Sequence, residues 1–521
     1  MQPAKYIPAI LATFLFISCA SNNQPKESLG VVDLEVTGNN AAQPAFKQGL
    51  LYLHSFEYED AAEAFQNAQQ LDPGFVMAYW GEAMTYNHPL WREQNYEKGN
   101  ATLVKLGTTP SERVAKAKSE LEKDFIKGIN ILYGTGNKTG RDSSYAAFME
   151  TLYQKYPGNN EVAAFYSLSL IGKAVTGRQT KVFEQAAEIA KEVIERNPLH
   201  PGALHYIIHA YDNPEHASLA LSTADKYAQV APDAGHALHM PTHTYLALGM
   251  WDKVVSSNIV SWAAEKDRKE RKKLNNDALG YHSYHWLLYG YLQQGKASIA
   301  RNMVDSMQRF CTELPSPAAR SHMIYLKATY LAETGDYDKE ITAISFEQKD
   351  LNVLTRARNY FVTGMAAYHQ NNEVELENII RQIAGERLIE KEKTNSNDIR
   401  VCGSINRSMP TLADLQKTEV MELQLKAMQA WMKNDAATTE KFLQQATALE
   451  TSSTYAYGPP TVVKPSYEMY GEWLLQMNRP KDALVQFEKS LESAPNKLLS
   501  IKGKETALNL LKEPAKSTTK S

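Results

Sequence analysis

The stretch GLLYLHSFEYEDAAEAFQNAQQLDPGF, residues 49–75, predicts two antiparallel helices joined by a short turn. The small residues Gly49 and Ala61 let the two helices approach closely, and Phe65 fills the layer between this pair and the next. Pro73 ends the second helix, because proline cannot continue the helical hydrogen bonds. Such a hairpin leaves an apolar face uncovered, so the stretch predicts further hairpins stacked on it.

The same frame returns near the C-terminus, in PSYEMYGEWLLQMNRPKDALVQFEKSLESAPNK at residues 465–497. There Gly471, Ala483, Phe487 and Pro495 take the positions of the small, aromatic and proline residues of the first hairpin. Weaker copies lie between the two outer hairpins, with a spacing of about 34 residues between equivalent positions. The period predicts an array of helical hairpins along most of the chain.

This pattern resembles the tetratricopeptide repeat family. The resemblance implies an all-α fold, an α-solenoid of helical hairpins that coils into a right-handed superhelix over residues 44–510. At about 34 residues each, roughly eight to ten hairpins fit in that length. It also implies a concave groove that is lined by the first helix of each hairpin and binds a peptide or protein partner.

Composition and charge agree with a globular helical protein. The chain has 521 residues, of which 43% are hydrophobic and 22% are charged, and a formal net charge of −3. This balance implies no polyanionic partner, so we expect no nucleic acid. The basic run KDRKERKK at residues 266–273 has interleaved acidic residues and no aromatic ones, which is typical of a solvated helix face.

The N-terminus predicts a lipoprotein. Residues 1–18 resemble a bacterial lipoprotein signal, with a short apolar run and a small residue, Ser18, before Cys19. The resemblance implies that the lipidated Cys19 attaches the protein to the outer membrane, facing the periplasm. Residues 19–43 are polar and lack periodicity, which predicts a flexible tether, and residues 511–521 predict a disordered tail.

Two further cysteines, Cys311 and Cys402, are far apart in the sequence. An oxidising compartment permits a disulfide between them, but the sequence does not indicate that their Cα atoms come within bonding range. We therefore expect two free thiols.

Histidines gather in three short segments. The chain has 13 histidines, and seven of them lie in LHYIIHAYD, HALHMPTHTY and GYHSYHW. Within each segment they are spaced three or four residues apart, which places them on one face of a helix. The seven are His205 and His209, then His236, His239 and His243, and finally His282 and His285.

The resemblance to tetratricopeptide repeats implies that this face lines the groove, because the histidines occupy groove-facing positions of first helices. Asp212 follows His209 on the same helix, where it can either orient an imidazole or cap the next turn at DNPEH. Near the C-terminus, Glu468 and Glu472 take equivalent positions, which leaves carboxylate ligands, a general base or a solvated face open. A single histidine such as His54 favours a satisfied place in the core or a surface position.

A second resemblance concerns the histidine segments themselves. The run HYIIHAYD…HALHMPTHTYLALGMWD…SN, with YNHPLW at residues 86–91 and GPP…KPSYEMYGE at residues 458–472, resembles a group of bacterial tetratricopeptide lipoproteins. The members of that group carry a His-Met-Pro-Ser/Thr-His segment. The resemblance places the histidines in one site and implies no particular reaction.

Clustered neutral imidazoles suit a divalent transition metal, namely zinc, copper, iron or nickel. The proline inside HMPTH predicts a kink that tilts the last histidine of the segment inward. Protonation is expected to release the metal around pH ~6.5, the ordinary pKa of imidazole. The expected centre of the site is His205, His209, His239 and His243, and its expected edge is His236, His282 and His285.

Three functions remain open at this point. The first is a binding or scaffold protein of the cell envelope, whose groove holds a peptide, protein or glycan with or without a metal. The second is a metalloenzyme with its site in the groove, and the third is an accessory lipoprotein in polysaccharide capture or degradation. The sequence contains no phosphate-binding loop, CxxC pair or nucleophile elbow.

The lipoprotein interpretation predicts the behaviour of one variant. Cys19→Ala is expected to leave the membrane fraction or to stall in processing, because a lipoprotein needs its acyl chains for stable attachment. Membrane fractionation followed by immunoblotting measures this, with Cys311→Ala as the control that stays attached. Unchanged attachment of Cys19→Ala would contradict the interpretation.

Overall fold

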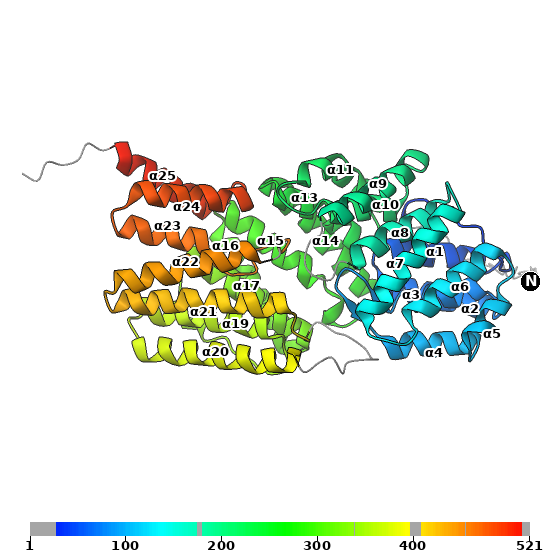
Figure 1. Ribbon diagram of the computed structural model, residues 1–521, viewed down its shortest axis with the longest axis horizontal. Helices are drawn as coiled ribbons and strands as arrows, with labels where there is room; N and C mark the ends of the chain where they lie inside the picture. The colour runs from blue at the N-terminus through cyan, green and yellow to red at the C-terminus, as the bar shows by residue number, and fades with distance from the viewer. Residues whose placement is uncertain (1–27, 174–179, 338, 396–407, 454, 513–521) are drawn as a thin grey trace, which may run out of the picture.

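The structure, a computed structural model, describes residues 28–173, 180–337, 339–395, 408–453 and 455–512. Over these residues the regular structure is helical, apart from one two-stranded antiparallel pair. The predicted all-α solenoid of helical hairpins is therefore confirmed (Figure 1). The expected signal peptide, Cys19, the start of the tether, Cys402 and most of the C-terminal tail lie outside the described residues.

The helices form two successive groups, which lie on opposite sides of the molecule in Figure 1. The first group runs through α1 (Gln43–His54), α2 (Tyr58–Leu71), α3 (Val76–Met84), β1 (Asn87–His88), β2 (Glu93–Gln94), α4 (Tyr96–Leu106), α5 (Pro110–Lys116), α6 (Glu120–Leu132), α7 (Lys138–Lys155), α8 (Asn160–Gly172), α9 (Thr180–Arg196), α10 (Pro201–Ala210), η1 (Ala217–Ala220), α11 (Leu221–Val230), α12 (Gly235–His239), α13 (Pro241–Ala247) and α14 (Trp251–Lys272). The second group runs through η2 (Asn276–Ala278), α15 (Tyr281–Gln293), α16 (Ala297–Glu313), α17 (Pro317–Thr334), α18 (Lys339–Thr342), α19 (Val353–His369), α20 (Glu373–Asn395), α21 (Leu412–Met432), α22 (Ala436–Ser452), α23 (Ser466–Gln476), α24 (Pro480–Ser493) and α25 (Leu498–Lys512).

The hairpin predicted from residues 49–75 is formed by α1 and α2. A Cβ atom on Gly49 would lie 2.8 Å from the ring of Phe65, so glycine is needed there. Ala61 and Phe65 are fully buried. Gly81 on α3 meets the same ring, and a Cβ atom there would lie 2.3 Å from it. Three helices therefore close around one aromatic side chain.

Two hydrophobic cores hold the two groups of helices together. The first core includes residues from Leu29 to Tyr289, and the second includes residues from Val255 to Ala507. Helix α15 contributes side chains to both cores, so it joins the two groups. Cys311 is a free thiol buried in the second core.

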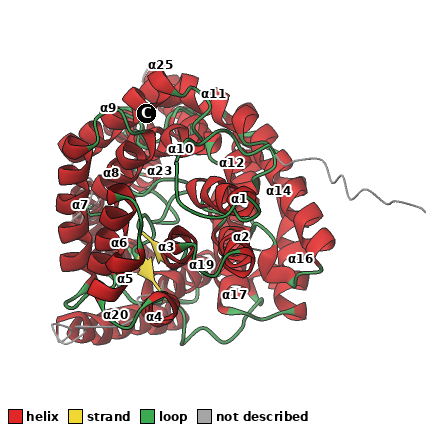
Figure 2. Cartoon of the chain, turned by 90° about the vertical axis from the view of Figure 1, so that its right-hand side faces the viewer, coloured by secondary structure: helices red, strands yellow, loops and turns green. Residues whose placement is uncertain are grey.

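The first hairpin lies inside the coil that the following helices form. Seen end-on, α1, α2 and α3 are surrounded by other helices (Figure 2). At the end of α1, the ring of His54 lies 2.8 Å from the hydroxyl of Tyr206 on α10 and 2.7 Å from the carboxylate of Glu161 on α8. In the first group of helices, the concave side of the coil is therefore filled by the chain's own first hairpin.

The last hairpin meets the middle of the chain. The indole N–H of Trp251, at the start of α14, donates to the carbonyl oxygen of Asn496 at 2.8 Å. The backbone N–H of Leu498 donates to the side-chain oxygen of Gln293 at 2.8 Å. Because the first of these bonds joins residues 245 positions apart, the coil closes on itself.

The prediction of a flexible tether over residues 19–43 is wrong for residues 28–42. Residues 28–42 lie along the first group of helices, where Leu29 is only 2% exposed. The backbone N–H of Val31 donates to the carbonyl oxygen of Leu199 at 2.9 Å. Apolar burial and backbone hydrogen bonds offset the entropy lost when such a segment is ordered. The described chain is therefore held against the fold from its first residues onward.

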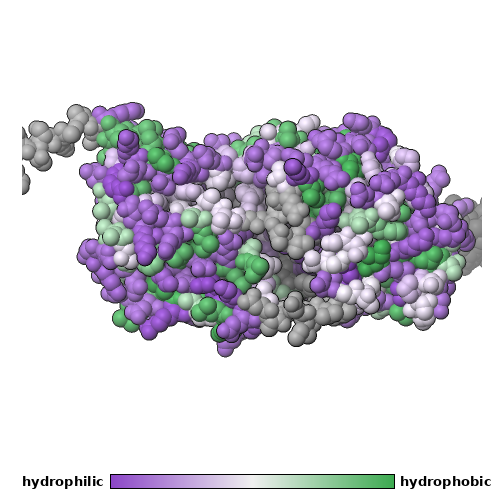
Figure 3. Space-filling model, viewed as in Figure 1, coloured by the Kyte–Doolittle hydropathy of each residue, from purple (hydrophilic) through white to green (hydrophobic). Residues whose placement is uncertain are grey.

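The surface of the molecule is mainly polar. The face shown in Figure 3 is largely hydrophilic, and its apolar residues form scattered groups. Among the described helices, none is both long enough and apolar enough to cross a membrane. Most large apolar side chains instead lie in the two cores.

The close packing at Gly49 predicts a loss of stability on substitution. Gly49→Leu is expected to lower the free energy of unfolding by ~1–3 kcal/mol, because the added side chain overlaps the Phe65 ring. Urea unfolding followed by circular dichroism measures the change. Gly385→Leu on α20 is the matched control, since a Cβ atom there meets nothing within 4 Å. Equal stability of the two variants would contradict this packing.

Candidate functional site

A proline divides the helix that carries HALHMPTHTY. Helix α12 ends at His239 and α13 begins at Pro241, because proline has no N–H for the helical bond. The N–H of His243 donates to the carbonyl oxygen of Met240 at 3.1 Å, a three-residue step that tightens the turn. The interruption that the sequence predicted is thus present between these two histidines.

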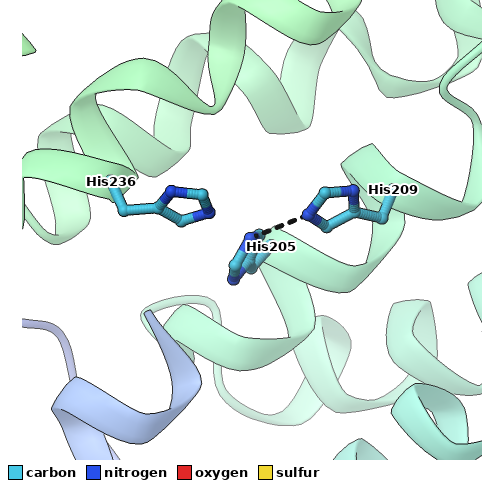
Figure 4. A group of neighbouring side chains, drawn as sticks. All are labelled: His205, His209 and His236. Carbon is cyan, nitrogen blue, oxygen red and sulfur yellow. Dashed lines mark hydrogen bonds between the residues drawn. The ribbon is translucent and has the colours of Figure 1, made fainter. Parts of the chain in front are cut away.

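Six of the seven predicted histidines form two triads, which come from α10, α12, α13 and α15. In each triad the candidate donor atoms lie within 4.8 Å of one another. Figure 4 shows one triad, in which two rings from α10 and one ring from α12 point toward a common space. The first triad is His205, His209 and His236, and the second is His239, His243 and His282.

The two triads adjoin one another. The ring centres of His209 and His243 are 5.4 Å apart, and Asp212 offers a carboxylate oxygen within 4.8 Å of both rings' donor atoms. The ring centres of His236 and His239 are 6.1 Å apart, which brings the triads together at a second point. The expected single centre of four imidazoles is therefore corrected to two adjoining groups of three.

The proton position on His239 follows from its neighbours. The side-chain N–H of Asn258 donates to the carbonyl oxygen of Val254 at 2.9 Å, so the amide oxygen of Asn258 faces the histidine. That oxygen lies 2.7 Å from Nδ1 of His239 and accepts a hydrogen bond from its N–H group. Nε2 then carries a lone pair, and it is buried without a hydrogen-bond partner in the part of the chain that the structure describes. Such an unmatched lone pair costs free energy unless a ligand binds it.

Two more rings are oriented in the same way. Nδ1 of His243 lies 2.6 Å from a carboxylate oxygen of Asp212, and Nδ1 of His205 lies 2.8 Å from the carbonyl oxygen of His54. Each acceptor receives a hydrogen bond from the Nδ1–H group, so Nε2 is left as the electron-pair donor. Metal-binding histidines are commonly held in this way. The Nε2 atoms of His205 and His209 form a hydrogen bond of 3.1 Å, a spacing close to that of two ligands on one ion (Figure 4). Two imidazole nitrogens on one tetrahedral zinc ion are ~3.3 Å apart.

Burial favours the neutral form of three of the six triad histidines. Desolvation lowers the pKa of His239 to about 3, and the neighbouring His243 contributes to the shift. Burial also lowers the pKa values of His205 and His282 well below the ordinary range, with adjacent histidines adding to the effect. His282 is the exposed member of the second triad. Neutral imidazole is the form that binds a metal.

Two carboxyl groups that the sequence analysis did not identify lie beside the first triad. A carboxylate oxygen of Glu57 accepts the backbone N–H of His236 at 2.9 Å. Burial raises the pKa of Glu57 to about 7. Burial and repulsion from Glu57 raise the pKa of Glu265, on α14, to about 8. This pair therefore holds a proton next to the first triad at neutral pH.

Aromatic side chains cover the two triads. Phe56, in the turn after α1, has its ring centre 4.2 Å from that of His205. The ring centres of Trp286, on α15, and Tyr457, in the loop before α23, lie 4.4 and 5.6 Å from that of His243. The prediction that the histidines line an open groove is therefore corrected, because the first hairpin and a loop of the second group lie over them.

Three predicted site residues lie apart from the triads. Nε2 of His285 is 2.9 Å from the hydroxyl of Thr329, on the side of α15 that faces α17. Glu468 and Glu472 pair with Lys464 at 3.0 and 2.6 Å. Packing between distant helices decides these contacts, and it separates the three residues from the histidine site.

A buried group of two histidines and a glutamate was missed in the sequence. The carboxylate of Glu161 lies 2.7 Å from Nε2 of His54 and 3.1 Å from Nε2 of His200. Nδ1 of His200 accepts the N–H of Ala203, and Nδ1 of His54 bonds to Tyr206, so no ring nitrogen is left for a metal. Although burial opposes it, the two histidines lower the pKa of Glu161. The group holds the fold together, and no sequence signal marks it because its members come from three distant segments.

Comparison with known proteins adds little to this picture. No family model matches the sequence, and no curated protein matches it. Similar solved structures include yeast Tom70, with a TM-score of 0.32 and 13% identity over 90% of this chain and 89% of that chain. They also include the human IFIT1 dimer with m7Gppp-AAAA, with a TM-score of 0.36 and 11% identity over 92% and 97% of the two chains. With TM-scores this low, the likenesses carry no argument about function.

The depressed pKa of His239 predicts a pH dependence of stability. Its pKa is about 3 in the folded protein and 6.5 in the unfolded chain, so the unfolded chain binds more protons between these values. Stability present above pH 6.5 is therefore lost as the pH falls toward 3. Urea unfolding of chelator-treated protein should show this loss, and His239→Gln should show a smaller one. An identical pH dependence in the two proteins would contradict the assignment.

Proposed function

We propose that this protein is a metal-binding module of the bacterial cell envelope. The observation that carries the proposal is the buried, unpartnered Nε2 of His239, beside the similarly oriented rings of His205 and His243. The lone pair of His239 lacks a protein donor within the described residues, and those of its neighbours lie close enough to share one ion with it. A divalent transition metal accepts several of them at once, which makes it the ligand that this arrangement fits best.

The donor set limits which metal fits. Each triad supplies three imidazole nitrogens, while Asp212, Asn258 and the carbonyl oxygen of His54 hold the rings in orientation. Such nitrogen ligands suit zinc, copper, iron or nickel. Calcium and magnesium prefer oxygen ligands, so the triads do not suit them.

Three protein ligands per ion leave a coordination position for an external group. Zinc sites that only stabilise a fold normally have four protein ligands, whereas sites that exchange a ligand keep one position open. We therefore infer that the bound ion takes up a donor group of a peptide, protein or glycan partner, which reaches it on the side of the exposed His282. The same open position, together with the proton held at Glu57 and Glu265, favours a metalloenzyme as the second candidate function.

The envelope location rests on the N-terminal sequence. Lipidation of Cys19 would attach the protein to the outer membrane, with its helices on the periplasmic side. Residues 28–42 run along the first group of helices, so the connection between lipid and fold is no longer than residues 19–27. The module would thus work close to the membrane surface, and its partner would be a component of the envelope.

The proposal predicts metal in the purified protein. After metal-replete expression, mass spectrometry is expected to find one ion per triad. The pair His239→Ala and His243→Ala should remove the ion of the second triad, and His205→Ala with His209→Ala should remove that of the first. Circular dichroism should show unchanged helix content in both. His322→Ala, outside both triads, is the matched control and should keep all of the metal.

The pH at which the metal is released provides a further check. Because burial lowers the pKa values of His205, His239 and His282, protons are expected to displace the metal only well below pH ~6.5. The pH expected for metal release is therefore lower than the pH ~6.5 predicted from the sequence alone. Protein that carries no metal and takes up none of zinc, copper, iron or nickel on titration would contradict the proposed function.

A further inference from the structure

A second candidate binding site lies in the other half of the molecule. A pocket of about 290 Å³ is formed between α17, α19, α21, α22 and α23, and none of its lining residues belongs to a histidine triad. Its volume is near the lower end of the ~300–1,000 Å³ typical of ligand pockets, which suits a small molecule or one side chain. Four large aromatic side chains line it, namely Tyr337, Tyr368, Trp431 and Trp473.

The aromatic rings surround the pocket in several orientations. Trp431 and Trp473 have ring centres 5.9 Å apart and planes at 86°. Tyr337 stacks on His369, with ring centres 4.5 Å apart and planes at 24°. Ring faces carry partial negative charge, so a set of rings at different angles attracts a cation placed among them.

Charged side chains stand against one wall of this pocket. The ammonium group of Lys497, which is fully buried, lies 2.7 Å from Glu333 and 3.1 Å from Glu468. The ammonium group of Lys464 lies 3.0 Å from Glu468 and 2.6 Å from Glu472. Three carboxylates therefore share two ammonium groups, which leaves one negative charge in excess.

The excess charge faces the pocket at Glu472. Glu333 accepts a further bond from Gln293, and Glu468 accepts one from Ser500. Oε2 of Glu472 has no hydrogen-bond partner within the described ranges, and the side chain is 42% exposed where it lines the pocket. The surrounding protein desolvates this carboxyl and raises its pKa, and the nearby Glu468 contributes to the shift. Desolvation is the largest cause of this shift, and the positive charge of Lys464 opposes it.

We propose that this pocket binds an organic cation, an alkylammonium or alkylguanidinium group. The alkyl stem lies against the aromatic rings, and the charged end pairs with Glu472. A neutral ring such as a sugar can stack on the same side chains, but it would cover the carboxylate of Glu472 and leave it with only Lys464, which Glu468 shares. Free amines and the side chains of lysine and arginine share this cationic chemistry.

Titration with matched probes tests the proposal and separates these two sources. Isothermal titration calorimetry at low salt compares N-acetyl-lysine methylamide, n-pentylamine and the neutral N-acetyl-norleucine methylamide. Both cations are expected to bind at least tenfold more tightly than the neutral probe, because only they form a charge-assisted hydrogen bond with Glu472. Tighter binding of the lysine derivative than of n-pentylamine assigns the pocket to a peptide side chain, and the reverse order assigns it to a free amine.

Variants locate the binding within the pocket. Glu472→Gln is expected to weaken binding of the cations on the order of tenfold, because it removes the excess charge and keeps the side-chain shape. Glu492→Gln, an exposed carboxylate on α24, is the matched control and should bind as the wild type does. Trp431→Leu should also weaken binding, because it removes one of the aromatic rings.

Three results would overturn the inference. They are equal binding of the neutral probe, unchanged binding in both Glu472→Gln and Trp431→Leu, and no saturable binding of either cation. Thermal unfolding of each variant shows that a lost signal does not come from a lost fold. None of these measurements depends on metal in the histidine triads, since the two sites share no residue.

Discussion

The buried carboxylate of Glu161 fixes the place where the first helix ends. It is fully buried and bonds to His54 and His200, so α1, α8 and the start of α10 meet at one point. A carboxylate in such a place needs both partners, because an unpaired buried charge costs several kcal/mol. The carbonyl oxygen of His54 in turn holds the ring of His205. The position of the first hairpin and the geometry of the first triad therefore depend on the same contact.

The helical hairpins and the histidine faces could be predicted from the sequence, because spacing along a helix determines which residues share a face. The grouping of the histidines could not, since it depends on how distant helices pack. His236 joins a triad, while His285, one turn beyond His282 on the same helix, bonds to a threonine instead. Asn258 stands in the run whose resemblance was noted, but its role appears only when His239 lies opposite its amide oxygen.

The two candidate sites differ in how they are prepared for a ligand. In the triads, burial and fixed Nδ1 protons leave neutral lone pairs that point inward, as at His239. In the aromatic pocket, two lysines are too few for three carboxylates, and the remaining charge lies at Glu472. The first arrangement lacks an electron-pair acceptor, and the second lacks a positive charge. Each site thus has an unsatisfied group that indicates the chemistry of its ligand.

Closure of the coil changes how the whole molecule responds to strain. In an open array each hairpin contacts only its neighbours. The terminal hairpins of such an array can therefore unfold without disturbing the middle ones. Here the bond from Trp251 to Asn496, together with the ion pairs of Lys497, connects hairpins that are far apart in the chain. Detaching the last hairpin would loosen the middle as well, which favours cooperative unfolding of the whole array. A closed frame of this kind keeps its helices at fixed relative positions, whereas an open superhelix can widen or narrow around a partner.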